Sequence, residues 1–302
     1  MPAPARIGDI QRMRNDVTSA AAKPSPFGRL LKEWRQVRGA SQLDFALASG
    51  ISQRHLSFLE SGRSRPSRGM VLHLASALAV PLRQQNAMLL AAGFAPVYAE
   101  RKLDAPELGP ISAALDRALA QQEPFPAVVV DRIYNLVRAN RATLTLLGTL
   151  LEPAALAPPA SGAPHNLMRL TIRRDGLRPH LENWEETIVW LLRRLRAEAI
   201  AEGARAHDAF LDELLADPDV ARVARAPREE VDHPPALTVR FRHGDTRLSL
   251  FSMIATVGTP LDVALQDLRL EFFFPADAAT EKWFRDRAAT GEAVGATRVG
   301  KA

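Results

Sequence analysis

The sequence predicts two domains: an all-α N-terminal domain of five short helices, and an α+β C-terminal domain with an antiparallel sheet of about five strands and helices. Apolar residues recur at helical spacing up to about residue 94, and β-branched or alternating runs appear only after residue 126. The net charge also differs between the two halves of the chain. Residues 1–105 carry 15 Lys and Arg against 7 Asp and Glu, a net +8, whereas residues 106–302 carry 24 against 27, a net −3.

The N-terminal helices follow from apolar spacing and from Gly and Pro at their ends. Leu30, Leu31 and Trp34 repeat at helical spacing before Gly39, which predicts the first helix over 27–38. The other four are expected as two within 41–60, one over 67–79 and one over 82–92.

The stretch 41–65 predicts a helix-turn-helix. Gly50 permits a sharp reversal between two short helices, and Leu56 and Leu59 fall on one face of the second. The opposite face carries polar side chains, as a helix that enters the DNA major groove requires. Arg54 and Gln53 are placed to read base edges, although an isolated Arg54 would also fit an ordinary solvated surface. The predicted base contacts are Gln53, Arg54, His55 and Ser57, and the predicted phosphate contacts are Gln42, Ser52, Arg63 and Arg65.

The segment 27–94 resembles the XRE/Cro-type helix-turn-helix through three features in order: SQ at 41–42, the run Ala46–Ser52 and the run Leu59–Ser67. The resemblance implies a double-stranded DNA operator as partner and an Arg35–Glu60 ion pair that locks two helices. The alternative is that these are two surface charges. One such module buries little surface, and dimers hold two helices about 34 Å apart on DNA, so we expect a homodimer.

The C-terminal half begins after a polar, Pro-bearing linker and mixes strands with helices. Expected helices lie at 111–122, 141–148, 181–202 and 206–216, expected strands at 127–131, 133–140, 236–241, 247–256 and 268–275, and an irregular loop at 152–164. Such a sheet, with helices packed on one face, is α+β.

This half is similar to the MmyB-like ligand-binding domain. The matching residues are 125–142, Asn166-Leu167, Asn183-Trp184 and 258–277. The resemblance implies a PAS-like fold and a small apolar, fatty-acid-like ligand. The expected domains are a flexible leader 1–24, a DNA-binding domain 25–95, a linker 96–110, a ligand-binding domain 111–287 and a flexible tail 288–302.

An apolar pocket between sheet and helices would suit an acyl chain. Its candidate lining residues are Val128, Val130, Leu136, Trp184, Ile188, Leu191, Phe251, Met253 and Phe273. The alternatives are that these side chains fill a solid core, and that the domain is a ligand-free module for dimerisation or protein interaction.

Composition argues against several other classes of protein. The chain has no Cys, no apolar run of 18 residues and no signal-peptide pattern, so we expect neither thiolate metal sites nor a membrane span, and a cytoplasmic location. No P-loop, G-x-S-x-G or HExxH motif is present, and none of the seven His pairs with another at i+3 or i+4. We therefore expect no enzyme activity, no metal and no cofactor.

Overall fold

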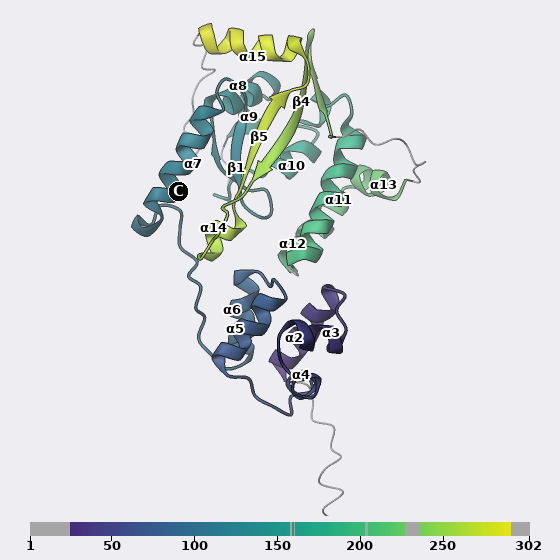
Figure 1. The fold of residues 1–302 in the computed structure, drawn as a ribbon. Helices are drawn as coiled ribbons and strands as arrows, with labels where there is room; N and C mark the ends of the chain where they lie inside the picture. Colours follow the sequence, from purple (N-terminus) through teal and green to yellow (C-terminus); the bar gives the residue numbers. More distant parts are fainter. Residues whose placement is uncertain (1–24, 158, 160, 203–204, 227–235, 291–302) are drawn as a thin grey trace, which may run out of the picture. The chain divides into compact units, whose positions relative to one another are not determined.

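The computed structural model describes residues 25–290, apart from 158, 160, 203–204 and 227–235 (Figure 1). The chain divides into two compact units between Val97 and Tyr98. The first unit contains α2 (Pro26–Val37), α3 (Gln42–Ala48), α4 (Gln53–Glu60), α5 (Arg68–Ala77) and α6 (Leu82–Ala91). The predicted five-helix domain is confirmed. Among the described residues, no helix of the chain has the length and hydropathy that a membrane crossing requires.

Serine side chains start four of these five helices. Ser25, Ser41, Ser52 and Ser67 each accept a hydrogen bond from the backbone N–H three residues later, which satisfies one of the free donors at each helix N-terminus. The helices bury an apolar core that includes Leu31, Leu56, Leu59, Leu74 and Met88. The serine caps fix where those four helices begin.

α2 and α4 approach each other closely at Gly28. A Cβ atom on Gly28 would lie 2.5 Å from the Glu60 carbonyl oxygen and 2.6 Å from that of Leu59. Only a residue without a side chain fits there, so this glycine sets the distance between the two helices.

The second unit is a five-stranded antiparallel sheet in the order β2-β1-β5-β4-β3, with helices around it (Figure 1). Its strands are β1 (Ala127–Val130), β2 (Leu136–Ala139), β3 (Val239–His243), β4 (Thr246–Ala255) and β5 (Arg269–Pro275). Its helices are η1 (Pro106–Leu108), α7 (Gly109–Gln121), α8 (Arg141–Leu150), α9 (Pro153–Leu156), α10 (Leu167–Ile172), η2 (Arg178–His180), α11 (Trp184–Glu202), α12 (Arg205–Leu215), α13 (Pro218–Arg225), α14 (Val263–Asp267) and α15 (Ala278–Thr290). The predicted α+β, PAS-like fold is confirmed.

The sequence predicts helices on one face of the sheet, but in the structure helices cover both faces. Val128 and Val130 join the main core, which α8, α10, α11 and α12 complete. Val129 points to the opposite face and packs in a second cluster with Leu115 and Leu119 of α7. Both faces of β1 are therefore covered, and its continuous apolar run reflects burial on two sides.

Asn140 ties β1 to the helices on either side of it. Its side-chain oxygen accepts from the backbone N–H groups of Ala127 and Thr143, both at 3.0 Å. Its amide nitrogen donates to the carbonyls of Phe125 at 2.8 Å and Leu119 at 3.3 Å. Asn140 also caps α8, by accepting from the Thr143 N–H.

Several expected boundaries were wrong. The helix expected to stop at Gly148 continues to Leu150, and the loop expected over 152–164 contains the short helix α9. α10, α13, α14 and α15 were not expected. α15 runs to Thr290, so residues 288–290 of the expected tail are helical, while the leader 1–24 and residues 291–302 lie outside the described residues.

Candidate functional site

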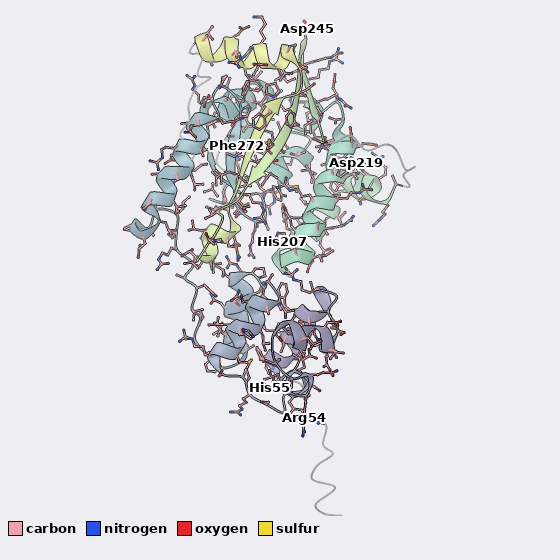
Figure 2. All side chains as sticks on the ribbon, viewed as in Figure 1. Arg54, His55, His207, Asp219, Asp245 and Phe272 are labelled. Carbon is pink, nitrogen blue, oxygen red and sulfur yellow. The ribbon has the colours of Figure 1, made fainter. Side chains whose placement is uncertain are left out.

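The exposed side of α4 is the first candidate site. Leu56 and Leu59 are fully buried, and this fixes which side of α4 faces outward. Gln53 and Arg54 lie on the exposed side, where Figure 2 shows Arg54 extending away from the helices of its unit. Ser52 caps the helix by accepting from the His55 N–H at 3.1 Å. His55 and Ser57 are half-buried, whereas Ser52, Arg63 and Arg65 are exposed.

Phe58 brings two of the predicted DNA contacts together. The guanidinium carbon of Arg54 lies 5.3 Å from the centroid of the Phe58 ring, and that of Arg63 lies 5.9 Å from the same centroid. Both distances fall within the range of cation–π attraction. Sequence reasoning missed Phe58, although its spacing of four residues from Arg54 on one helix was a usable signal.

Arg35 and Glu60 form the ion pair on which α2 and α4 meet. Arg35 Nε donates to Glu60 Oε1 at 2.7 Å and its Nη2 to Oε2 at 3.1 Å, with side chains 9% and 4% exposed. Gln42 Nε2 also donates to Glu60 Oε2, at 2.7 Å. The Gln42 side chain, predicted to meet a phosphate, is thus held against Glu60 by one of its two amide hydrogens.

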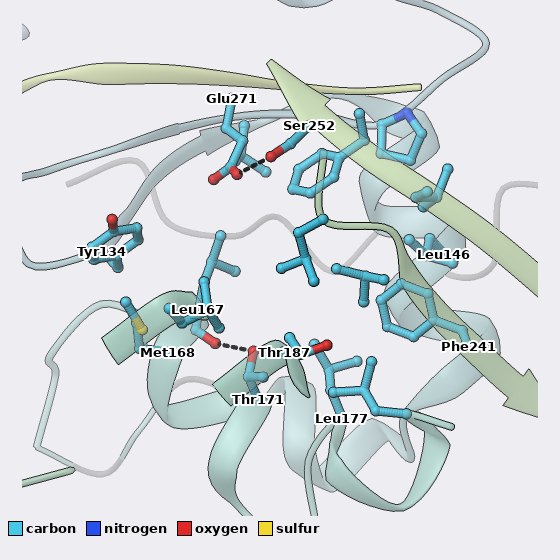
Figure 3. Close-up of a pocket in the computed structure, with 18 of the residues that line it drawn as sticks. Tyr134, Leu146, Leu167, Met168, Thr171, Leu177, Thr187, Phe241, Ser252 and Glu271 are labelled. Carbon is cyan, nitrogen blue, oxygen red and sulfur yellow. Dashed lines mark hydrogen bonds between the residues drawn. The ribbon is translucent and has the colours of Figure 1, made fainter. Parts of the chain in front are cut away.

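The second candidate site is a pocket of about 360 Å³ inside the second unit, lined mainly by apolar side chains (Figure 3). It lies between the sheet and the helices that cover its inner face. Val128, Leu191 and Phe273, three of the predicted residues, line it. Other residues that line the pocket include Tyr134, Leu146, Leu167, Met168, Leu177, Leu181, Trp190, Phe241 and Leu250.

Four predicted lining residues are instead part of the solid core beside the pocket. They are Val130, Leu136, Trp184 and Ile188, all buried. The Trp184 indole N–H donates to the Thr171 carbonyl at 3.0 Å, and the Arg178 guanidinium covers its ring at 4.0 Å. These contacts hold Trp184 away from the pocket.

Two further predictions, Phe251 and Met253, were wrong because they assigned the wrong face of β4. Side chains alternate along a strand, and Leu248, Leu250 and Ser252 are the ones that point inward. Met253 is 60% exposed and lies on the other face. The run 247–256 is apolar on both faces near its centre, so periodicity alone did not fix its register.

A set of polar groups lies at one wall of the pocket. Ser252 Oγ donates to Glu271 Oε1 at 2.6 Å, and Arg194 Nη1 lies 3.6 Å from the same oxygen. Arg194 Nε donates to Glu198 Oε1 at 3.1 Å, and the Tyr134 hydroxyl donates to Glu198 Oε2 at 3.1 Å. Burial raises the pKa of the Tyr134 hydroxyl far above its usual range, so it stays a donor. Burial opposes the charge of Arg194, but Tyr134, Glu271 and Glu198 together raise its pKa.

Sequence reasoning missed this polar wall. Arg194 was not among the residues predicted to line the pocket, yet Thr187, Trp190, Leu191 and Arg194 all line it. Their spacing of three, four and seven residues puts them on one face of α11, which was the available signal. Glu271 and Ser252 come from two different strands, and no local pattern pairs them.

Two family models match this chain. The model of the MmyB-like transcription regulator ligand binding domain matches residues 111–286, and a helix-turn-helix model matches residues 31–85. Comparison with curated proteins finds no match. Among solved structures, one titled "Structure of an RNA-binding Light-Oxygen-Voltage Receptor" covers 96% of this chain and 69% of its own, at 15% identity and a TM-score of 0.26. That likeness is too weak to carry any argument.

The two family matches agree with the two candidate sites. The helix-turn-helix match contains α4 and its exposed arginines, and the longer match contains the pocket and its polar wall. The longer match spans more than half of the chain. The chain therefore belongs to the MmyB-like transcription regulators, and it combines an XRE-type DNA-binding helix-turn-helix with a ligand-binding domain.

Proposed function

We propose that this regulator senses a small apolar ligand, an acyl chain, in the pocket of its second unit. The observation that carries the proposal is the pocket itself: about 360 Å³ of space within the domain core, lined mainly by hydrocarbon side chains. Volumes of this size suit small-molecule sites, and a filled core would leave none. A ligand changes DNA binding only if its affinity differs between the DNA-competent and incompetent states.

On the DNA side, α4 enters the major groove of an operator as part of a homodimer. Gln53, Arg54, His55 and Ser57 contact base edges, and Gln42, Ser52, Arg63 and Arg65 contact phosphates. The exposure of Arg54, Arg63 and Arg65 and the net positive charge of residues 1–105 support this assignment.

The ligand proposal is tested by extracting the purified chain with organic solvent and analysing the extract by mass spectrometry. We expect acyl-chain compounds in near-stoichiometric amount, and we expect their removal to change the affinity for operator DNA. As a control, Leu250→Trp fills the pocket with a larger side chain and should abolish the co-purification. A chain that carries no lipid and binds no added acyl compound would overturn the proposal.

A second candidate function, a dimerisation or interaction module, is favoured by exposed apolar side chains on β4. Met253 is 60% exposed on the face that points away from the pocket, and Ile254, on the opposite face, is 41% exposed. Exposed apolar patches mark contacts with other chains. Analytical ultracentrifugation of Met253→Lys tests this candidate: dissociation of a wild-type dimer would support it, and an unchanged oligomeric state would count against it.

A further inference from the structure

The polar wall of the pocket, formed by Ser252, Glu271, Arg194, Glu198 and Tyr134, determines which ligand head group can bind. Among the described residues that line the pocket, Arg194 and Glu271 carry the only formal charges. The polar end of a ligand at this wall therefore lies near one positive and one negative side chain. The kind of head group that fits depends on which of these two side chains can still pair with a ligand.

The charge of Arg194 is already matched by protein groups. Its Nε donates to Glu198 at 3.1 Å, its Nη1 lies 3.6 Å from Glu271, and its guanidinium lies over the Tyr134 ring. Glu198 also has Arg269 Nε at 3.7 Å. The two arginines and two glutamates of this network cancel in formal charge, and their side chains are between 11% and 25% exposed.

Glu271 has room for another donor. Its Oε1 accepts from Ser252, and among the described residues no group donates to its Oε2. An ionised carboxylate accepts up to about four hydrogen bonds and donates none. Figure 3 shows Glu271 and Ser252 on one side of the pocket, opposite Thr171 and Thr187.

Thr187 adds a second polar contact that the protein leaves unused. It is 2% exposed, lines the pocket, and its hydroxyl has no hydrogen-bond partner among the described residues. A hydroxyl in such a place is satisfied by a polar atom of a ligand or by water. The hydroxyl can donate or accept, so it fits an uncharged polar group.

We propose that the pocket selects a hydrocarbon chain that ends in an uncharged hydrogen-bond donor, such as a hydroxyl or primary amide, over one that ends in a free carboxylate. The inference depends on the ligand-sensing function proposed above. A hydroxyl or amide N–H donates to Glu271 and leaves the charges of the network balanced. A ligand carboxylate would add a third negative charge to a largely buried set whose positive charges are already matched, and uncompensated buried charge is strongly unfavourable.

The test uses the full-length chain, freed of co-purifying lipid, and three probes with the same hydrocarbon chain: dodecanol, dodecanamide and dodecanoic acid. Binding is followed at neutral pH, below micelle-forming concentrations, by isothermal titration calorimetry and by the fluorescence change expected from Trp190, which lines the pocket. We expect the alcohol and the amide to bind about tenfold or more tightly than the acid. The affinity of the acid should rise as the pH falls and its own carboxyl is neutralised.

Glu271→Gln removes one negative charge and should reverse the order, because Arg194 is then free to pair with a ligand carboxylate. Glu281→Gln is the matched control and should leave the order unchanged, because the Glu281 side chain is 47% exposed and pairs with Arg285 one turn away on α15. The ranking in the unmodified chain decides the question even if Glu271→Gln fails to fold. If the acid binds most tightly, the head-group inference is wrong and ligand sensing stands; if none of the probes binds, both are wrong.

Discussion

Arg54 and Phe58 lie one helical turn apart on α4, with the guanidinium carbon 5.3 Å from the ring centroid, and Arg63 approaches the same ring. The ring restricts two long side chains that would otherwise lose more rotamer freedom on meeting DNA. We expect Phe58→Leu to weaken operator binding about fivefold to thirtyfold, because it removes two exposed cation–π contacts that contribute about 0.5–1 kcal/mol each. Fluorescence anisotropy with labelled duplex measures this loss. Phe58→Tyr keeps the ring and should bind nearly as the unmodified chain does; equal losses in both variants would contradict the idea.

Arg54 and Arg63 should differ in the kind of DNA binding that they support. Arg54→Ala should remove about 1–3 kcal/mol of discrimination between operator and random duplex, because it deletes a donor to base edges. Arg63→Ala should weaken both duplexes alike and reduce the salt slope of binding by about one. Anisotropy titrations over a range of salt concentrations separate the two effects. Equal losses on both duplexes for Arg54→Ala would show that it does not read bases.

The buried pair between α2 and α4 should be sensitive to the loss of either partner. Glu60→Gln leaves Arg35 charged at a site only 9% exposed, so we expect the free energy of unfolding to fall by about 3–5 kcal/mol. Denaturant unfolding followed by circular dichroism measures it. The double variant Arg35→Met, Glu60→Leu removes both charges and should recover much of the loss. A double variant as unstable as the single one would mean that packing, rather than charge, explains the effect.

Gly28 should tolerate no side chain. In Gly28→Ala the new Cβ would lie 2.5 Å from a backbone oxygen of α4, and backbone cannot rotate away as a side chain does. We expect a destabilisation of about 1–3 kcal/mol and weaker operator binding, since α4 has to shift. Thermal unfolding and anisotropy check both. Gly69→Ala, at a helical position where a Cβ meets nothing within 4 Å, is the matched control.

Thr187→Val should stabilise the ligand-free chain, which is unusual for a core substitution. It keeps the shape of the side chain but removes a buried hydroxyl without a partner, whose desolvation costs about 1–3 kcal/mol. Thr171→Val is the control, because the Thr171 hydroxyl donates to the Leu167 carbonyl at 2.8 Å and its loss brings no such gain. Urea unfolding of lipid-free protein compares the two. A fall in stability for Thr187→Val equal to that of Thr171→Val would show that its hydroxyl is satisfied.

Local patterns predicted most of the fold and little of the pocket. Ser25, Ser41, Ser52 and Ser67 cap helices through neighbours in sequence, and such signals can be read directly from the chain. α13 could have been found in the same way, because Asp217 caps it and Pro218 occupies its first turn.

The pocket depends on strand register and on partners far apart in the chain. β5 lies between β1 and β4, and this arrangement brings Glu271 beside Ser252 and within reach of Arg194. A shift of one residue in the assumed facing of β4 exchanged Ser252 for Met253. No pattern within either strand could have corrected it.

Tyr134 has a backbone φ of +65°, in the left-handed region that a residue with a side chain occupies at a cost of about 1–2 kcal/mol. A glycine would relieve that strain at the corner between β1 and β2. It would also delete the hydroxyl that holds Glu198 and the ring beneath Arg194, and so release the guanidinium from its orientation. An unstrained backbone at this corner and an ordered charge network therefore exclude each other. A variant selected only for heat resistance would tend to lose its discrimination between ligands.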